Sequence, residues 1–117
     1  RADVTRRGQR FAVVYFPERR QVLKESWSQA LKCWPKASAL AWDLDKPNRS
    51  LEAFLRHEGV SYLDLTPHFR NYVAKTGHTI FFSRDWHIDA EGHRLAARLV
   101  NEWLLSEHLV PRPGKPR

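Results

Sequence analysis

Asp85 and His87 lie two residues apart and form the pair in this sequence best suited to acid–base chemistry. An imidazole works as a general base near neutral pH only when its tautomer and its orientation are fixed. A carboxylate that accepts a hydrogen bond from the far ring nitrogen fixes both, and it stabilises the imidazolium that forms. Because two residues of loop let Asp85 reach back to the ring, the spacing allows a catalytic dyad.

The flanking residues place the pair in a loop between a strand and a helix. Residues 79–82, which are apolar from Ile80 on, indicate the end of a buried strand, while Asp89 is a good N-cap for a following helix. That helix carries one apolar stripe, formed by Gly92, Leu95, Ala96, Leu99 and Trp103. An acid and a histidine without this context would indicate a surface loop or a helix cap, whereas strand, loop and helix together favour catalysis.

Two runs resemble the last conserved block of SGNH/GDSL hydrolases: Asp85-Trp86-His87, and Asp89-Ala90-Glu91-Gly92-His93 with the following Leu95-Ala96-Ala97. In that family the block supplies the Asp and the His of a Ser-His-Asp triad, just before the C-terminal helix. Many members space the pair as Asp-x-x-His. The Asp-x-His of this chain is closer to the alginate O-acetyltransferase-like branch. Residues 59–67 also resemble the segment that precedes the block, which has a structural role.

The resemblance implies a fold and a missing partner. Residues 1–110 would form the C-terminal part of an SGNH hydrolase-like domain, an α/β fold with a partial three-layer, flavodoxin-like parallel sheet and flanking helices. The family's nucleophilic Ser, its Gly and its Asn are not recognisable here, so the resemblance implies that they lie upstream of Arg1. The chain has no Met, and an SGNH domain usually needs roughly 180 residues or more. We therefore expect a fragment that is inactive alone and poorly stable, with an unpaired sheet edge.

Trp86 and Arg19 are the predicted substrate contacts. Trp86 stands between the two dyad residues, where it either walls an acyl pocket or simply packs. Residues 17–21 follow the strand predicted over residues 11–16, and functional loops of parallel sheets follow the carboxyl ends of strands. Arg19 or Arg20 is therefore a candidate contact for an acidic substrate. The acyl-transfer chemistry requires no cofactor and no metal.

The remaining pattern alternates strands and helices. The continuous apolar run 11–16 is typical of a strand buried on both faces. A helix is predicted over residues 20–34, with Trp27 and Trp34 in the core and Pro35 at its end. A weak strand or extended connection over 37–44 is followed by a helix over 51–57 capped by Ser50. A strand over 60–65 and a helix over 66–75 follow, so the order predicts an α/β fold with a parallel sheet.

Composition limits the other classes of function. The net charge is +7, from 20 Lys and Arg against 13 Asp and Glu. We interpret this excess as solvated surface and tail charge, with residues 111–117 a disordered, basic, Pro-rich tail. Cys33 has no partner for an internal disulfide and is expected to be buried. No apolar run approaches the roughly 20 residues of a membrane span. The compartment, bacterial periplasm or cytoplasm, and the oligomeric state stay open.

Several functions therefore compete. The leading one is a serine esterase acting on a small ester or an acetylated carbohydrate, and the first alternative is an O-acetyltransferase acting on a polysaccharide. A non-catalytic SGNH-like domain that binds carbohydrate or protein is another, and nucleic-acid binding driven by charge is a further one. A metal hydrolase built on Asp85, His87 and His93 is remote. Asp43 and Asp45 are interpreted as turn formers rather than as metal ligands.

Overall fold

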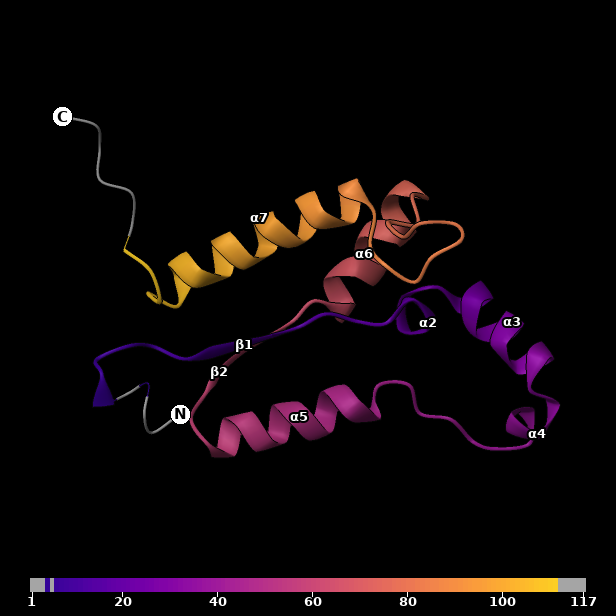
Figure 1. The fold of residues 1–117 in the computed structure, drawn as a ribbon, viewed down its shortest axis with the longest axis horizontal. Coiled ribbons are helices and arrows are strands. Elements are labelled where there is room, and N and C mark those ends of the chain that lie inside the picture. Colours follow the sequence, from indigo (N-terminus) through magenta and orange to yellow (C-terminus); the bar gives the residue numbers. More distant parts are fainter. Residues whose placement is uncertain (1–3, 5, 112–117) are drawn as a thin grey trace.

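The computed structural model describes residue 4 and residues 6–111. The strands and helices alternate along the chain (Figure 1), in the order β1 (Ala12–Tyr15), α2 (Arg19–Val22), α3 (Lys24–Cys33), α4 (Pro35–Ser38), α5 (Lys46–His57), β2 (Ser61–Asp64), α6 (Thr66–Thr76) and α7 (Ala90–Ser106). The two strands pair in parallel, with Ala12 opposite Ser61 and Tyr15 opposite Asp64. The predicted α/β class with a parallel sheet is confirmed.

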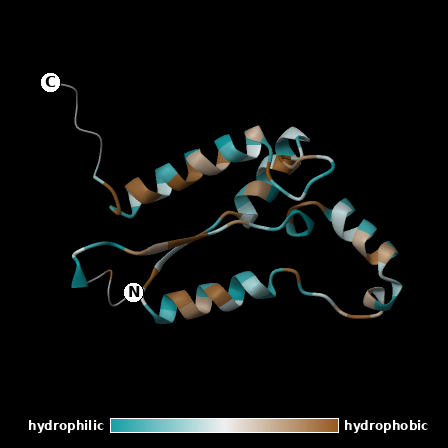
Figure 2. Cartoon of the chain, viewed as in Figure 1, coloured by the Kyte–Doolittle hydropathy of each residue, from teal (hydrophilic) through white to brown (hydrophobic). Residues whose placement is uncertain are grey.

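The strand pair lies between two helices, α7 on one side and α5 on the other (Figure 1). Both helices alternate hydrophobic and hydrophilic residues along their length (Figure 2), as expected for helices that cover a sheet with one face. The core gathers residues from α2, α6, α7 and the short connections next to them: Val22, Leu23, Leu65, Phe69, Ile80, Phe81, Leu95 and Ala96. The arrangement is a partial three-layer α/β unit.

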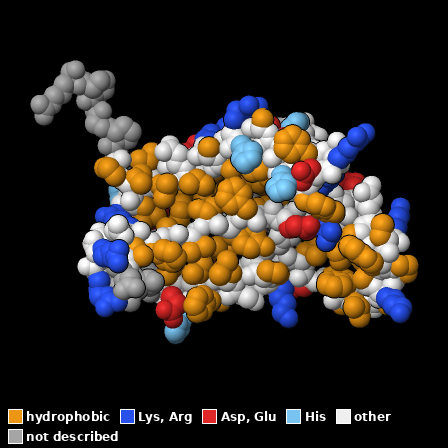
Figure 3. All heavy atoms as spheres, viewed as in Figure 1, with side chains coloured by type: hydrophobic (Ala, Val, Ile, Leu, Met, Phe, Trp, Pro, Cys, Tyr) orange, Lys and Arg blue, Asp and Glu red, His pale blue; other side chains and the backbone are white. Residues whose placement is uncertain are grey.

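β1 is less buried than its sequence predicts. All its residues are half-buried, and Phe16 just beyond it is 50% exposed. In the sheet of the described residues, β1 pairs along one edge only, with β2. Figure 3 shows a broad band of hydrophobic side chains over α7, the strands and α5. The accessible surface is 8946 Å², against about 6,600 Å² for a compact monomer of this mass. The expectation of burial on both faces is therefore wrong for this chain.

The helix predicted over residues 20–34 is divided into α2 and α3. Leu23 separates them with an extended backbone (φ −103°, ψ 110°), and its side chain is 5% exposed in the core. Glu18 and Gln21 form a capping box that holds the short α2. The apolar spacing continues through the break, so periodicity alone does not reveal it.

The end of this region also differs from the sequence prediction. Pro35 begins α4 instead of only ending a helix. Trp34 is 55% exposed and Cys33 is exposed, because α3 turns these residues away from the core. Trp27 is half-buried and packs edge-on against Trp42, with ring centroids 5.6 Å apart. The predicted core positions of Trp34 and Cys33 are wrong.

α5 begins earlier than the sequence predicted. It starts at Lys46, with Pro47 in its first turn, so Ser50 lies inside the helix and does not cap it. The residues before α5 form no strand, and the two acids there pair with arginines. Asp43 pairs with Arg49 on α5, and Asp45 accepts two hydrogen bonds from Arg70 on α6, at 3.0 and 2.6 Å.

α6 and α7 agree closely with their predictions. α6 ends at Gly77, whose φ of 72° is the left-handed conformation that glycine adopts easily. Asp89 caps α7 by accepting the backbone N–H of Gly92 at 2.8 Å. The strand expected over residues 79–82 is absent from the described structure, where Phe81 forms a single antiparallel bridge with Ile88.

The predicted tail and the search for membrane-spanning helices both depend on which residues the structure describes. Most of the tail predicted to be disordered, residues 112–117, lies outside them. Within the described part of the chain, no helix has the length and apolarity to cross a bilayer.

Candidate active site

Asp85 and His87 lie on a loop with a buried base and an exposed tip. At the base, the N–H of Phe82 donates to the carbonyl of His87 at 3.1 Å, and the N–H of Asp89 donates to the carbonyl of Ile80 at 3.0 Å. Ile80 is fully buried, whereas residues 82–87 are all exposed. The loop therefore projects from the core into solvent and returns directly into the cap of α7.

The loop brings the predicted pair together. His87 Nδ1 lies 2.5 Å from Asp85 Oδ1, and the backbone N–H of His87 donates to the same oxygen at 3.1 Å. These two hydrogen bonds, from the backbone first and the ring second, lower the pKa of the Asp85 carboxyl. An ionised carboxylate can only accept, so Nδ1 carries a proton, and in the neutral imidazole Nε2 then presents its lone pair.

The free ring nitrogen of His87 faces solvent. The side chain is 83% exposed, and Nε2 bonds to no group in the described part of the chain. A histidine with one nitrogen bound to a carboxylate and the other free is able to take a proton from a hydroxyl group brought to it. The predicted contact between Asp85 and His87 is therefore present, and its catalytic role stays a prediction.

Trp86 lines a cavity of about 330 Å³ beside the dyad, together with residues of α2 and α3 and with Asp85. Its ring lies under the guanidinium of Arg20, at 4.4 Å from centroid to Cζ, and Trp34 lies 5.4 Å from the same atom. The structure thus places Trp86 both on a cavity wall and in a cation–π contact. Its contact with substrate stays a prediction.

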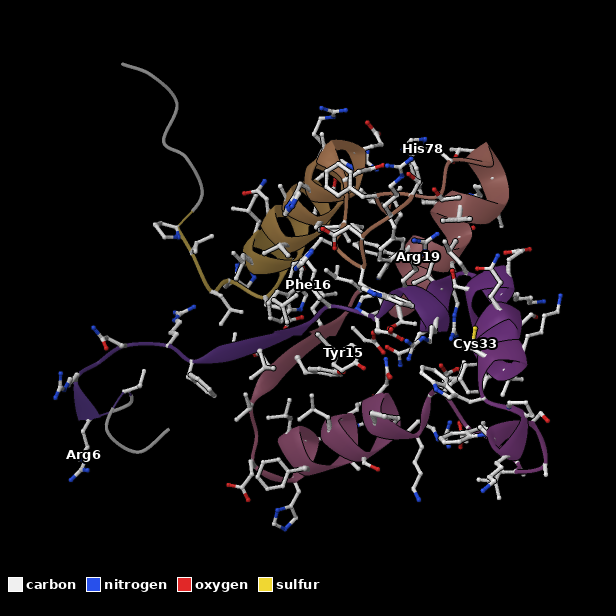
Figure 4. The ribbon with its side chains drawn as sticks, turned by 45° about the vertical axis from the view of Figure 1, so that its right-hand side comes forward. Arg6, Tyr15, Phe16, Arg19, Cys33 and His78 are labelled. Atoms are coloured by element: carbon white, nitrogen blue, oxygen red, sulfur yellow. The ribbon has the colours of Figure 1, made fainter. Side chains whose placement is uncertain are left out.

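Arg19, the second predicted substrate contact, stands at the start of α2 and reaches the loop (Figure 4). Its Nη1 donates to the carbonyl oxygens of Phe82, Ser83 and Asp85, at 3.0, 3.3 and 3.3 Å. Its Nε donates to Ser26 Oγ at 3.0 Å. Nη2 has no partner within the described residues, so contact with an acidic substrate also stays a prediction.

Some residues of the site cannot be found by sequence reasoning. Trp34 and Cys33 line the cavity because Leu23 turns α3 relative to α2, and no local pattern marks that turn. The helical spacing of Trp34 indicates a core position instead. Arg20 lines the same cavity from α2 and was already a candidate beside Arg19, because both follow the strand predicted over residues 11–16.

The structure also shows where His93 lies relative to the metal site considered for Asp85, His87 and His93. His93 is exposed on the first turn of α7. Among residue 4 and residues 6–111, no three His, Cys, Asp or Glu side chains gather in a group that would hold a metal ion. The structure therefore does not bring Asp85, His87 and His93 together as a ligand set.

A carboxylate-bound histidine on the loop before the last helix of a parallel α/β unit is the arrangement used by α/β serine hydrolases. The family comparison gives the class directly: the model of the SGNH hydrolase-like domain of acetyltransferase AlgX matches residues 1–115. The chain belongs to this family, which confirms the resemblance seen in the sequence. No curated protein and no solved structure matches the chain.

Proposed function

We propose that this chain supplies the Asp–His half of a Ser-His-Asp triad in an SGNH-type acyl-transfer enzyme. The hydrogen bond between His87 Nδ1 and Asp85, which leaves Nε2 free, is the observation that supports the proposal most strongly. The nucleophilic serine and the oxyanion-hole donors lie outside residues 1–117. The full-length protein is accordingly the catalyst.

The residues divide the reaction between them. His87 Nε2 takes the proton of the serine hydroxyl as the serine oxygen attacks the acyl carbonyl, and Asp85 stabilises the imidazolium. The imidazolium then gives its proton to the departing alkoxide, which leaves an acyl-serine. In the second half, His87 deprotonates the acceptor hydroxyl, the acyl group passes from the serine to it, and the imidazolium returns the proton to the departing serine oxygen. Trp86 forms one wall of the acyl pocket.

The acceptor decides between an esterase and an O-acetyltransferase. Water gives hydrolysis, and a sugar hydroxyl gives transfer, with the same dyad in both cases. The family description, an acetyltransferase, and the Asp-x-His spacing favour transfer to a carbohydrate. An acetyl donor assayed with and without a polysaccharide acceptor separates the two: acetylated polysaccharide indicates a transferase, and acetate release alone indicates an esterase.

The test of the proposed function is the variant His87→Ala in the full-length protein. Acetyl-ester turnover should fall by several orders of magnitude, as for triad members in general. The matched control is His93→Ala, another exposed histidine six residues along the chain, which should keep its rate. Near-normal turnover by His87→Ala would exclude the dyad as the catalytic base, whereas no turnover by the wild-type protein itself would favour a non-catalytic, carbohydrate- or protein-binding domain.

A further inference from the structure

The exposed loop that carries the dyad poses a physical problem. Catalysis needs its groups held to a fraction of an ångström, since a misplacement of about 1 Å costs about 100-fold in rate. Burial does not provide this precision, because residues 82–87 are all exposed. The bridge between Phe81 and Ile88 fixes the base of the loop but not its tip. Another contact must therefore hold the segment on which Asp85 stands.

Arg19 makes that contact. Three carbonyl oxygens of the loop, from Phe82, Ser83 and Asp85, point at the single nitrogen Nη1. Carbonyl dipoles that converge in this way repel one another unless a cation lies between them. A guanidinium N–H supplies charge-assisted hydrogen bonds and keeps its charge at every pH of interest.

The other end of the Arg19 side chain is anchored. Its Nε donates to Ser26 Oγ at 3.0 Å, and Ser26 is only 8% exposed on α3. Its backbone carbonyl accepts the N–H of Leu23, whose side chain lies in the core. The guanidinium plane is therefore fixed before it meets the loop.

The neighbouring Arg20 acts on the same loop from the side. Its guanidinium lies over the ring of Trp86, the residue between the two members of the dyad. The two consecutive arginines of α2 thus hold the backbone and the central side chain of the loop. The ring of His87 is in turn held by Asp85.

We propose that Arg19 is a positioning residue of the dyad, which holds the backbone of residues 82–85 so that Asp85 and His87 keep their hydrogen bond. It does so without touching the reacting atoms. The catalytic consequence rests on the proposed function, whereas the structural consequence does not.

Kinetics of the full-length protein test the catalytic part. Arg19→Ala should lower kcat for an acetyl ester by about 10- to 100-fold, with KM nearly unchanged. Arg19→Lys should recover part of the loss, because an ammonium donates to clustered carbonyls but cannot also reach Ser26. The matched control is Arg56→Ala, an exposed arginine on α5 paired with Glu52, which should change neither parameter. An unchanged kcat, or a loss confined to KM, would overturn the proposal, and the latter would indicate a substrate contact.

NMR of the loop residues in the full-length protein tests the structural part independently. In Arg19→Ala the amides of residues 83–87 should broaden or shift, and the pKa of the Asp85 carboxyl should rise toward its ordinary value. Arg19→Lys, which keeps the charge, should show smaller changes, and Arg56→Ala should show none. Spectra of Arg19→Ala that match the wild type in the loop would overturn the proposal. If His87→Ala kept full activity while these spectra changed, the proposed function would fail and the loop contact would stand.

Discussion

A single oxygen of Asp85 accepts two hydrogen bonds from His87, one from the ring Nδ1 at 2.5 Å and one from the backbone N–H at 3.1 Å. The same atom therefore fixes the turn of the chain and the tautomer of the ring. A side chain of equal shape that can donate as well as accept would keep the turn but would no longer dictate the tautomer.

Asp85→Asn should consequently leave the fold intact and remove most of the activity. We expect kcat for an acetyl ester to fall on the order of 1,000- to 10,000-fold, as it does when the triad carboxylate becomes an amide. Steady-state kinetics of the full-length protein measure the change. Asp43→Asn is the matched control, because Asp43 is also exposed but pairs with Arg49 on α5. A rate within a few-fold of the wild type would mean that Asp85 does not orient the ring.

Asp89 should contribute to stability in a pH-dependent way. It caps α7 and also contacts His78 Nε2 at 3.0 Å. Burial acts to raise its pKa, but the hydrogen bonds from Gly92 and His78 lower it overall. Asp89→Ala should cost about 1 kcal/mol at pH 7, the usual value of an N-cap.

The direction of the pH effect follows from the lowered pKa of Asp89. Its stabilisation is complete above the ordinary carboxyl pKa of about 3.9 and is lost as the pH falls through the lowered value. Urea unfolding at pH 7 and near pH 3 should therefore show a gap between wild type and Asp89→Ala that narrows in acid. Asp89→Asn, which keeps a capping oxygen, serves as the control. An equal gap at both pH values would contradict the account.

Gly92 should tolerate no side chain. A Cβ atom there would lie 2.7 Å from the carbonyl oxygen of Ile80 and 3.0 Å from Cβ of Ile88, and both residues flank the dyad loop. We expect Gly92→Ala to lower the free energy of unfolding by about 1–3 kcal/mol, since the backbone oxygen cannot move aside cheaply. Thermal or urea unfolding measures it. Ala97→Gly, at an exposed position of α7, is a control that should cost about 1 kcal/mol through helix propensity alone. A Gly92→Ala variant as stable as the wild type would contradict the close packing.

Asn48 should contribute strongly to the free energy of unfolding. It is 5% exposed, donates to Asp64 at 2.7 Å and to Thr66 at 2.8 Å, and accepts from Gln21 at 2.7 Å. Asn48→Ala removes this partner from the buried Thr66 hydroxyl and from Asp64, while Gln21 Nε2 keeps the carbonyl of Leu44, so we expect a loss of about 1–3 kcal/mol in urea unfolding. Asn71→Ala, an exposed asparagine on α6, should be nearly neutral. A cost for Asn48→Ala as small as that of the control would show that water replaces the network.

The features that were predicted best from the sequence are those that local residue types determine. The cap at Asp89, the stop at Gly77 and the parallel strands 12–15 and 61–64 follow from residue type and spacing, and they appear in the structure. The dyad contact was also predictable, because a two-residue separation leaves the carboxylate few other partners. The caps, the strand segments and the dyad contact depend on neighbours within a few positions of the chain, whereas the parallel pairing of Ala12 with Ser61 was inferred from the order of strands and helices.

Features that depend on distant contacts could not be predicted. Leu23 breaks a helix because its side chain reaches the core, which no periodicity shows. The network around Asn48 joins α2, α5 and the end of β2, and it appears only once they are packed. The contacts of Arg19 span more than sixty residues of sequence, so its type suggested a substrate contact while its surroundings indicate a loop support.

The burial of β1 also depends on distant contacts and could not be predicted from the sequence. The run over residues 11–16 correctly indicated a strand of a parallel sheet, yet β1 is only half-buried. An apolar run is typical of a strand that neighbouring elements cover on every side. β1 has one neighbouring strand in the described sheet. The resulting band is visible in Figure 3.

The rate at which the full-length protein becomes acylated tests the central claim most directly. Rapid mixing with an activated acetyl ester should show fast formation of an acetyl-enzyme in the wild type. In His87→Ala the rate should fall by several orders of magnitude, because no base then removes the proton of the nucleophile. Acetylation of His87→Ala at the rate of the wild type would contradict the assignment of His87 as that base.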